Sequence, residues 1–346
     1  MTSTHPTGDP ALPELGGRAP TLAHVARLAG VSPATASRVL TGSARVSDAA
    51  RSRVDEAVER LGYVRPAGSR ARRSGTVAAV LCEDGCRVLG DPYFARLLWG
   101  VRRELNGRAP LVVLMAGRAD EWRATIGYLR GGHAEGVLLV GARRDQAGPL
   151  ARAAGGAPVV LAGRPLDEMP LPYVDVDNRG GALAAVRHLL GAGRRRIGTI
   201  AGPADLGAGV DRLEGYRLAA EEAGMGVTGL VCRGDFGRLS GERAMDRLLQ
   251  RRPDVDAVLA ASDEMAVGAL SALRRAGRRV PDDVAVVGFD DAPVARQVRP
   301  RLTTVRRPSE DLGARLAREL GAHTGGRPVA ERAVVLRTKL IIRESA

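Results

Sequence analysis

The stretch Thr21-LAHVARLAGVSPATASRVLTGSARVSDAARSRVDEAVERLG-Tyr63 decides the fold of the N-terminal part of this chain. Apolar residues recur in it at helical spacing in three short segments, and helices this short are stable only when they are packed on one another. Gly30 supplies a tight turn between the first two helices. Thr21, Ser32 and Ser47 stand where the three helices begin, where a hydroxyl can cap free backbone N–H groups. The stretch therefore predicts a helix-turn-helix unit.

A helix-turn-helix leaves the outer face of its second helix free to enter the major groove of DNA. We expect Arg38 to donate two hydrogen bonds to a guanine edge and Ala34 to contact a thymine methyl group. Hydroxyls and helix N-termini can bind phosphate. A three-helix bundle with a solvated polar face is the alternative interpretation of the spacing alone. The predicted DNA-contacting residues are Thr21, Ser32, Pro33, Ala34, Thr35, Ser37, Arg38 and Ser47.

These residues also resemble a known family. The pattern A-x-x-A-G-V-S-x-x-T-x-S-R-V-L, followed by V-S and then L-G-Y, is similar to the N-terminal domain of the lac repressor (LacI/GalR) family. The resemblance implies that the first two residues of the second helix and its arginine read bases. In this sequence they are Pro33, Ala34 and Arg38.

The segment after Tyr63 departs from the family pattern. The family has a hinge helix, P-N-x-x-A-R-x-L, whose leucine wedges into the minor groove, whereas this chain reads R-P-A-G-S-R-A-R-R-S-G. Arg70 matches the family arginine, and Arg72 stands at the wedge position. Gly68 and Pro66 are poor helix formers. We therefore expect Arg70 and Arg72 to bind DNA, with Arg72 entering the minor groove without the kink that an apolar wedge produces.

Composition indicates a globular, basic protein of more than one domain. The chain has 346 residues, 45% of them hydrophobic and 26% charged, and a formal net charge of +13. A net charge of +6 falls between residues 21 and 73, which suits attraction to phosphate, although a general bias toward arginine explains part of the excess.

Targeting, cofactor and metal signals are weak. The first 20 residues contain no apolar signal-peptide core, and no apolar run approaches the length of a membrane span. Three cysteines cannot form an even disulfide framework, and no His or Cys cluster completes a metal site. The sequence predicts a cytoplasmic protein with a disordered tail, no membrane contact, no cofactor and no metal.

From Thr76 onward, strand-like apolar runs alternate with amphipathic helical segments, which is typical of parallel sheets covered by helices on both faces. There are too many strand–helix units for one sheet, so we expect two α/β lobes that face a cleft. The predicted strands are Val77–Leu81, Leu111–Met115, Gly136–Val140, Pro158–Ala162, Ile197–Ala201, Ala257–Ala261 and Val284–Phe289.

Polar and aromatic residues that follow these strands are expected to converge at the cleft, because such sheets bind ligands at the carboxyl ends of their strands. Carboxylates and guanidiniums can bracket vicinal hydroxyls, and aromatic faces can stack on a sugar or a base. The alternative is that each Asp is a helix cap and each aromatic belongs to the core. The predicted effector-binding residues are Tyr93, Phe94, Arg212, Phe236, Asp263 and Asp290.

The resemblance extends over this region. V-D-x-D-N-x-x-G-A, R-L-x-G-Y, S-D-E-M-A-x-G-A and V-A-V-V-G-F-D-D are similar to the effector domain of the LacI/GalR family, which is itself similar to two-lobed periplasmic sugar-binding proteins of type I. The polar, Pro- and Gly-rich composition of the N-terminus predicts the tail at residues 1–19. The resemblance implies a helix-turn-helix domain at 20–64, a hinge at 65–75 and a ligand-binding and dimerisation domain at 76–346. The first lobe is expected at about 76–163 and 292–325, and the second at about 164–291 and 326–346.

Three functions are open to a chain with this organisation. A regulator binds pseudo-palindromic operator DNA as a homodimer and senses a small molecule, by family default a sugar or sugar derivative, with a purine-like base as the other option. A solute-binding protein without gene control would carry a signal peptide and no helix-turn-helix. An enzyme of the doubly wound class would need a phosphate loop or a catalytic pair, and neither stands out. The sequence therefore favours a non-enzymatic transcription regulator, most simply a repressor.

Overall fold

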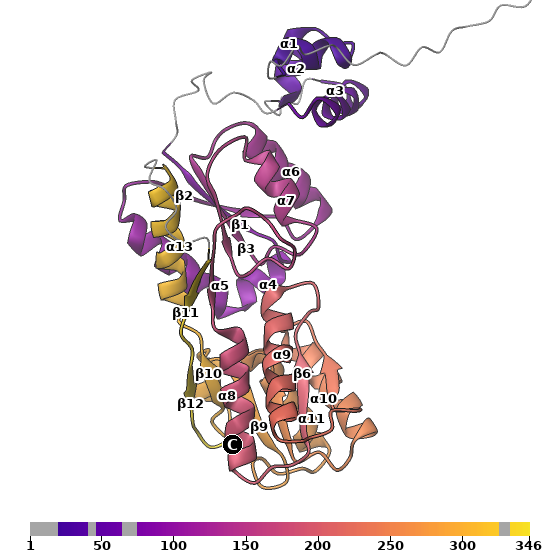
Figure 1. Cartoon of the computed structure of the whole chain (residues 1–346), viewed down its shortest axis with the longest axis vertical. Helices are drawn as coiled ribbons and strands as arrows, with labels where there is room; N and C mark the ends of the chain where they lie inside the picture. Colours follow the sequence, from indigo (N-terminus) through magenta and orange to yellow (C-terminus); the bar gives the residue numbers. More distant parts are fainter. Residues whose placement is uncertain (1–19, 41–45, 64–74, 325–332) are drawn as a thin grey trace, which may run out of the picture.

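The computed structural model describes residues 20–40, 46–63, 75–324 and 333–346. A three-helix head lies beyond one end of a body made of two α/β lobes (Figure 1). The expected tail and most of the expected hinge, with Arg70 and Arg72, fall outside the described residues. No helix in the described ranges combines the length and apolarity that crossing a membrane requires.

The head contains α1 (Leu22–Leu28), α2 (Pro33–Leu40) and α3 (Asp48–Leu61), as the sequence predicts. Val25, Ala36 and Val54 are fully buried where the three helices meet. Gly30 adopts a φ of 62°, a left-handed conformation that suits glycine at the turn between α1 and α2. The Thr21 N–H donates to Nδ1 of His24 at 3.2 Å, which satisfies one of the free donors at the start of α1.

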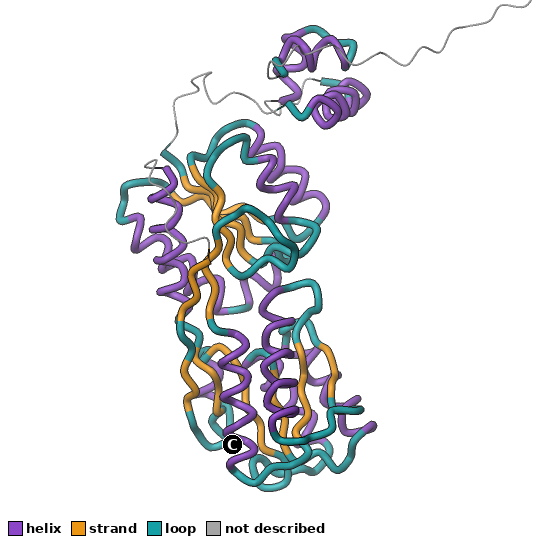
Figure 2. The backbone as a smooth tube through the Cα atoms, in the orientation of Figure 1, coloured by secondary structure: helices purple, strands orange, loops and turns teal. Residues whose placement is uncertain are grey.

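The first lobe is built on a parallel six-stranded sheet in the order β11-β5-β4-β3-β1-β2. Figure 2 shows helices on both sides of it. Residues of α5 and α13 form one apolar layer with the sheet, and residues of α6 and α7 form the other. The elements are β1 (Val77–Leu81), α4 (Gly85–Gly90), α5 (Pro92–Leu105), β2 (Leu111–Met115), α6 (Ala119–Arg130), β3 (Gly136–Val140), α7 (Ala147–Ala153), β4 (Val159–Ala162), β5 (Tyr173–Val176), α13 (Ser309–Thr324) and β11 (Ala333–Leu336).

The second lobe repeats this plan with the sheet order β12-β10-β9-β8-β6-β7, in which β12 is antiparallel to β10. Helices α8 and α9 cover one face, and α10 and α11 cover the other. The elements are α8 (Asn178–Gly191), β6 (Ile197–Ala201), α9 (Gly207–Glu222), β7 (Val231–Arg233), α10 (Arg238–Arg251), β8 (Ala257–Ala260), α11 (Asp263–Arg275), β9 (Ala285–Asp290), α12 (Val294–Gln297), β10 (Thr303–Arg306) and β12 (Lys339–Ile341).

The chain crosses between the lobes three times, after β5, after β10 and after β11. Two crossings touch, because the N–H of Asp177 donates to the carbonyl of Leu336 at 2.8 Å. The expected lobe boundaries are therefore wrong at three places: β5 and β11 belong to the first sheet, and β10 belongs to the second. These strands have four residues each, and their place is decided by pairing with distant strands, which no local pattern reveals.

Two glycines allow α5 and α13 to pack closely in the first lobe. A Cβ at Gly313 would overlap the carbonyl oxygen of Leu97, and a Cβ at Gly100 would overlap that of Glu310. We expect Gly313→Ala to lower the free energy of unfolding by about 1–3 kcal/mol, the usual cost of overpacking a tight contact. Urea unfolding followed by circular dichroism measures this change.

Gly321→Ala is the matched control on the same helix, because nothing lies within 4 Å of a Cβ at Gly321. Alanine there should leave stability unchanged or raise it by up to about 1 kcal/mol, since alanine is the better helix former. Equal stability of the Gly313→Ala and Gly321→Ala proteins would contradict the close packing of α5 and α13.

Candidate functional site

The outer face of α2 presents the residues that the sequence predicts for base contact. Pro33, Ala34 and Arg38 are exposed, whereas Ala36 and Val39 are buried against the other two helices. Thr35 and Ser37 are half-buried at the edge of this face. The head therefore offers one polar helical surface with a long cationic side chain on it.

The three hydroxyl residues predicted to meet phosphate are exposed at the starts of the helices. Ser32 Oγ accepts from the N–H of Thr35 at 3.0 Å, and Ser47 Oγ accepts from the N–H of Ala50 at 3.4 Å. Capping holds these hydroxyls at helix N-termini, where the helix dipole favours an anion. Thr21 occupies the equivalent N-cap position of α1.

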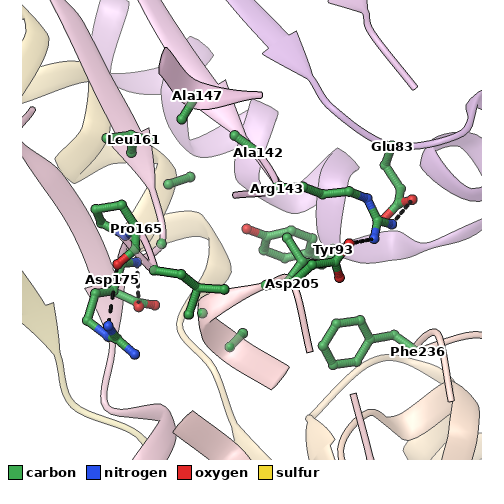
Figure 3. A pocket seen from close by; sticks show the side chains of 18 of the residues that line it. Glu83, Tyr93, Ala142, Arg143, Ala147, Leu161, Pro165, Asp175, Asp205 and Phe236 are labelled. Carbon is green, nitrogen blue, oxygen red and sulfur yellow. Dashed lines mark hydrogen bonds and ion pairs between the residues drawn. The ribbon is translucent and has the colours of Figure 1, made fainter. Parts of the chain in front are cut away.

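A cavity lies between the two lobes, and the space inside it, counted together with the solvent at its open mouth, is about 990 Å³. Figure 3 shows side chains entering it from both lobes. Most of the loops that line it follow the carboxyl ends of strands, as expected for open parallel sheets. The charged and aromatic lining residues are Glu83, Arg87, Asp91, Tyr93, Phe94, Arg143, Arg144, Arg164, Asp175, Asp205, Arg212, Phe236, Asp290 and Arg307.

Five of the six predicted effector residues line this cavity, namely Tyr93, Phe94, Arg212, Phe236 and Asp290. Tyr93 and Phe94 begin α5 and meet edge to face, with ring centroids 5.0 Å apart. Phe236 follows β7 with a φ of 72°, and Asp290 ends β9 with a φ of 120°. Such backbone strain in non-glycine residues is concentrated at ligand sites.

Asp263 is the exception, and its predicted contact with effector is not supported by its position. It is 1% exposed and does not line the cavity. Its carboxylate accepts from the hydroxyl of Thr304 at 2.5 Å and from the N–H of Ala292 at 2.7 Å. Asp263 begins α11 behind the end of β9, so the side chain supports the turn after Asp290, and burial raises its pKa well above the usual range.

Arg212 is a buried residue of the cavity lining. Its Nε donates to Oδ1 of Asn178 at 2.9 Å, and its guanidinium lies 3.7 Å from the centre of the Phe289 ring. An oxygen of Asp290 is 3.6 Å from Nη2. Burial lowers the pKa of Arg212 to about 10, although the charge of Asp290 acts in the opposite direction. The residue therefore stays cationic at neutral pH although it is buried.

Several buried polar atoms of the lining have no hydrogen-bond partner, although Nη2 of Arg212 and Oδ1 of Asp290 take part in ion pairs. Among the described residues, five inaccessible side-chain nitrogen or oxygen atoms lack a hydrogen bond, and four of them belong to the cavity lining. An unpaired buried donor or acceptor costs about 1–3 kcal/mol. Their grouping favours a ligand that both donates and accepts hydrogen bonds. The four atoms are Nε of Arg87, Nη2 of Arg212, Oδ1 of Asp290 and Nε of Arg307.

Arginines of the first lobe reach acceptors of the second across the cavity mouth. Arg143 contacts Glu83 in its own lobe at 3.2 Å and Asp205 in the other lobe at 2.6 Å (Figure 3). Arg164, which follows β4, contacts Asp211 of α9 at 2.5 Å. These ion pairs hold the lobes together around the cavity.

Sequence reasoning missed several charged lining residues. Arg143, Arg164 and Arg307 follow β3, β4 and β10 within a few residues. The rule that polar residues after strands reach the cleft would have found Arg143 and Arg164, had it been applied to every predicted strand. It could not have found Arg307, because β10 was not among the predicted strands. Asp175 gave no such signal because it lies within β5, where it accepts from the N–H of Arg164 at 2.8 Å.

A helix-turn-helix head joined to a two-lobed body with a polar, aromatic-lined cavity defines a DNA-binding protein that responds to a small ligand. Residues 21–66 match the family described as bacterial regulatory proteins, lacI family, and residues 186–346 match the periplasmic binding protein-like domain.

Known proteins similar to this chain are transcription regulators. The HTH-type transcriptional regulator CelR of Thermobifida fusca is 46% identical over 335 residues, which are 95% of this chain and 98% of that protein. The HTH-type transcriptional repressor CytR of Escherichia coli K12 is 33% identical over 94% of this chain and 96% of its own length. A solved transcriptional regulator CelR-cellobiose complex is 45% identical, with a TM-score of 0.78 over 94% of this chain and 100% of that one.

The chain belongs to the LacI family of bacterial regulatory proteins. The resemblance and the two-part fold class expected from the sequence are confirmed. The protein is accordingly a DNA-binding transcription regulator, and its similar curated relatives are regulators, not enzymes.

Proposed function

We propose that this protein is a repressor that binds a pseudo-palindromic operator as a homodimer and changes its operator affinity when a neutral sugar fills the cavity between the lobes. The observation that carries this proposal is the group of buried polar atoms without a hydrogen bond in a cavity to which both lobes contribute. A ligand held by both lobes favours the closed arrangement and so shifts the population of body conformations.

The charge balance of the cavity supports a neutral ligand. Its lining carries five carboxylates and six guanidiniums. Most of these guanidiniums are engaged by carboxylates, as Arg143 is by Asp205 and Glu83 and as Arg212 and Arg307 are by Asp290. Hydroxyl groups suit the remaining donors and acceptors, and Tyr93 and Phe236 offer ring surfaces for a sugar. Because the similar CelR structure is a complex with cellobiose, we propose cellobiose or a related neutral oligosaccharide as effector.

The DNA contacts of the proposal come from the head. Two heads related by a two-fold axis would read the two half-sites of the operator. In one chain, Asp55 of α3 lies 2.7 Å from Arg130 of α6, which connects the head to the first lobe. Movement of that lobe on closure would change the spacing of the two heads. The proposed DNA-binding residues are Thr21, Ser32, Pro33, Ala34, Thr35, Ser37, Arg38, Ser47, Arg70 and Arg72.

The proposed function implies domain bounds for the chain and a location in the cell. We assign the DNA-binding domain to residues 20–64, the hinge to 65–75 and the ligand-binding and dimerisation domain to 76–346. The protein would act in the cytoplasm, where its operator lies, without catalytic activity.

Selection of bound duplexes from a random library, followed by fluorescence anisotropy at fixed salt, tests this function. We expect the selected duplex to bind roughly 10³-fold or more tightly than a scrambled duplex of the same composition. Cellobiose should then weaken binding by roughly 5- to 150-fold, the usual range of allosteric coupling. Glucose serves as the control for ligand size, and adenosine tests the purine alternative.

Two results would overturn the proposal. Equal affinity for the selected and scrambled duplexes would refute sequence-specific binding. A response to adenosine without a response to any sugar would replace the proposed effector class with a purine-like one.

A further inference from the structure

Arg307 lies in one of the three crossings between the lobes. β10 ends at Arg306 in the second lobe, and α13 begins at Ser309 in the first. The N–H of Arg307 donates to the carbonyl of Asp290 at 3.4 Å, and its own carbonyl accepts from the N–H of Ser309 at 2.8 Å. The backbone of Arg307 is therefore hydrogen-bonded to both lobes at this crossing.

The side chain of Arg307 also contacts both lobes. Its guanidinium carbon lies 3.7 Å from the centre of the Tyr93 ring, which belongs to α5 of the first lobe. Its Nη2 lies 2.9 Å from Oδ1 of Asp290, at the end of β9 in the second lobe. A planar guanidinium can stack and form an ion pair at once, but only while the two partners are close together. These two contacts coexist in this arrangement of the lobes.

Two buried polar atoms of Arg307 and Asp290 lack a hydrogen bond. The Arg307 side chain is 11% exposed, and its Nε is inaccessible to solvent and has no hydrogen-bond partner in the described part of the chain. Oδ1 of Asp290 is near Nη2 but has no well-oriented hydrogen bond. Both residues line the cavity. A single hydroxyl can accept from Nε and donate to the carboxylate, because it carries both functions.

We propose that Arg307 is a specificity-determining residue of the effector site, which selects a ligand with a hydroxyl group placed between its Nε and Asp290. This inference rests on the proposed sugar effector and adds a particular contact to it. A lysine at this position keeps the charge but has no second donor in a fixed plane, so it cannot replace the arginine.

Isothermal titration of cellobiose and its singly deoxygenated analogues tests the contact. In the wild-type protein, one analogue should bind roughly 10- to 100-fold more weakly than cellobiose, the usual effect of losing a hydrogen bond to a charged group. In Arg307→Gln and in Arg307→Lys, cellobiose should weaken by a similar factor. In these variants, the analogue that binds weakly to the wild-type protein should bind as well as cellobiose does, because the contact with Arg307 is already absent.

Arg306→Gln is the matched control. Arg306 precedes Arg307 directly, but its side chain is 45% exposed, contacts Asp291 at 2.7 Å and does not line the cavity. In this variant, the analogue that binds weakly to the wild-type protein should still bind more weakly than cellobiose by the same factor. Arg307→Lys keeps the positive charge beside Asp290, so it carries the test even if Arg307→Gln unfolds.

The outcomes separate the two proposals. The role of Arg307 would be overturned if Arg307→Lys bound cellobiose as tightly as the wild-type protein does and ranked the deoxygenated analogues in the same way. The proposed sugar effector would then still stand. Absence of binding by the wild-type protein to cellobiose and to every analogue would refute the proposed effector, and the Arg307 proposal with it.

Discussion

Arg38→Ala is expected to lower the affinity for the selected duplex by about 1–3 kcal/mol, with a much smaller effect on a scrambled duplex. Arg38 is exposed on α2 beside Ala34, while the opposite side of the helix is buried in the head. An arginine at this place can donate two hydrogen bonds to O6 and N7 of guanine. Alanine removes both bonds, so sequence preference falls more than general attraction to phosphate. Fluorescence anisotropy with both duplexes at one salt concentration measures the difference.

Arg60→Ala is the control for charge. Arg60 is exposed in the last turn of α3, in the same head but not on α2. Its removal should weaken binding to both duplexes by a similar factor, because the loss is one of general electrostatic attraction. If Arg38→Ala also weakened both duplexes equally, α2 would not be the recognition helix.

Asp290→Asn is expected to abolish stabilisation by the effector. With cellobiose at about 100 times its Kd, the wild-type protein should gain about 2.7 kcal/mol of unfolding free energy, and the variant should gain nothing measurable. Oδ1 of Asp290 lies 2.9 Å from Nη2 of Arg307 and 3.6 Å from Nη2 of Arg212, and it has no hydrogen-bond partner in the described residues. Asparagine keeps the shape but removes the charge that organises both arginines.

The same substitution should destabilise the free protein. Removing one partner of a buried ion pair costs about 3–5 kcal/mol, because the remaining charges stay buried without compensation. Here two nearly inaccessible guanidiniums share that single carboxylate. Thermal unfolding with and without cellobiose measures both effects in one experiment.

Asp254→Asn provides the comparison on the surface of the same lobe. Asp254 pairs with Arg252 at 3.0 Å outside the cavity lining. This variant should keep the full shift produced by cellobiose. A full shift in Asp290→Asn would contradict the assignment of the cavity as the effector site.

Much of this architecture could be predicted from local patterns. The three helices of the head followed from helical spacing and from Gly30, because such signals reside in a few neighbouring residues. All seven predicted strands occur, each within a residue of its expected bounds. The family resemblance also rests on contiguous motifs. The alternation of strands and helices indicates the same fold class without reference to any family.

The candidate site was predicted less completely. The rule that ligand-binding residues gather at the carboxyl ends of strands placed Arg212, Phe236 and Asp290 at the cavity. Asp290 ends β9, Phe236 follows β7, and Arg212 lies in α9, the helix after β6. The rule misplaced Asp263, whose carboxylate turns back to Thr304. It also missed Arg307, because β10 was not among the predicted strands.

The sequence by itself determined which segments form helices and strands and that a helix-turn-helix precedes two α/β lobes, since these properties depend on residues close together in the chain. Only the tertiary structure decided which lobe holds β5, β10 and β11, and that Tyr93, Asp290 and Arg307 meet around one cavity. The physical reason is that strand pairing and buried ion pairs join residues far apart in sequence. These contacts form, and contribute their free energy, only when the chain has folded.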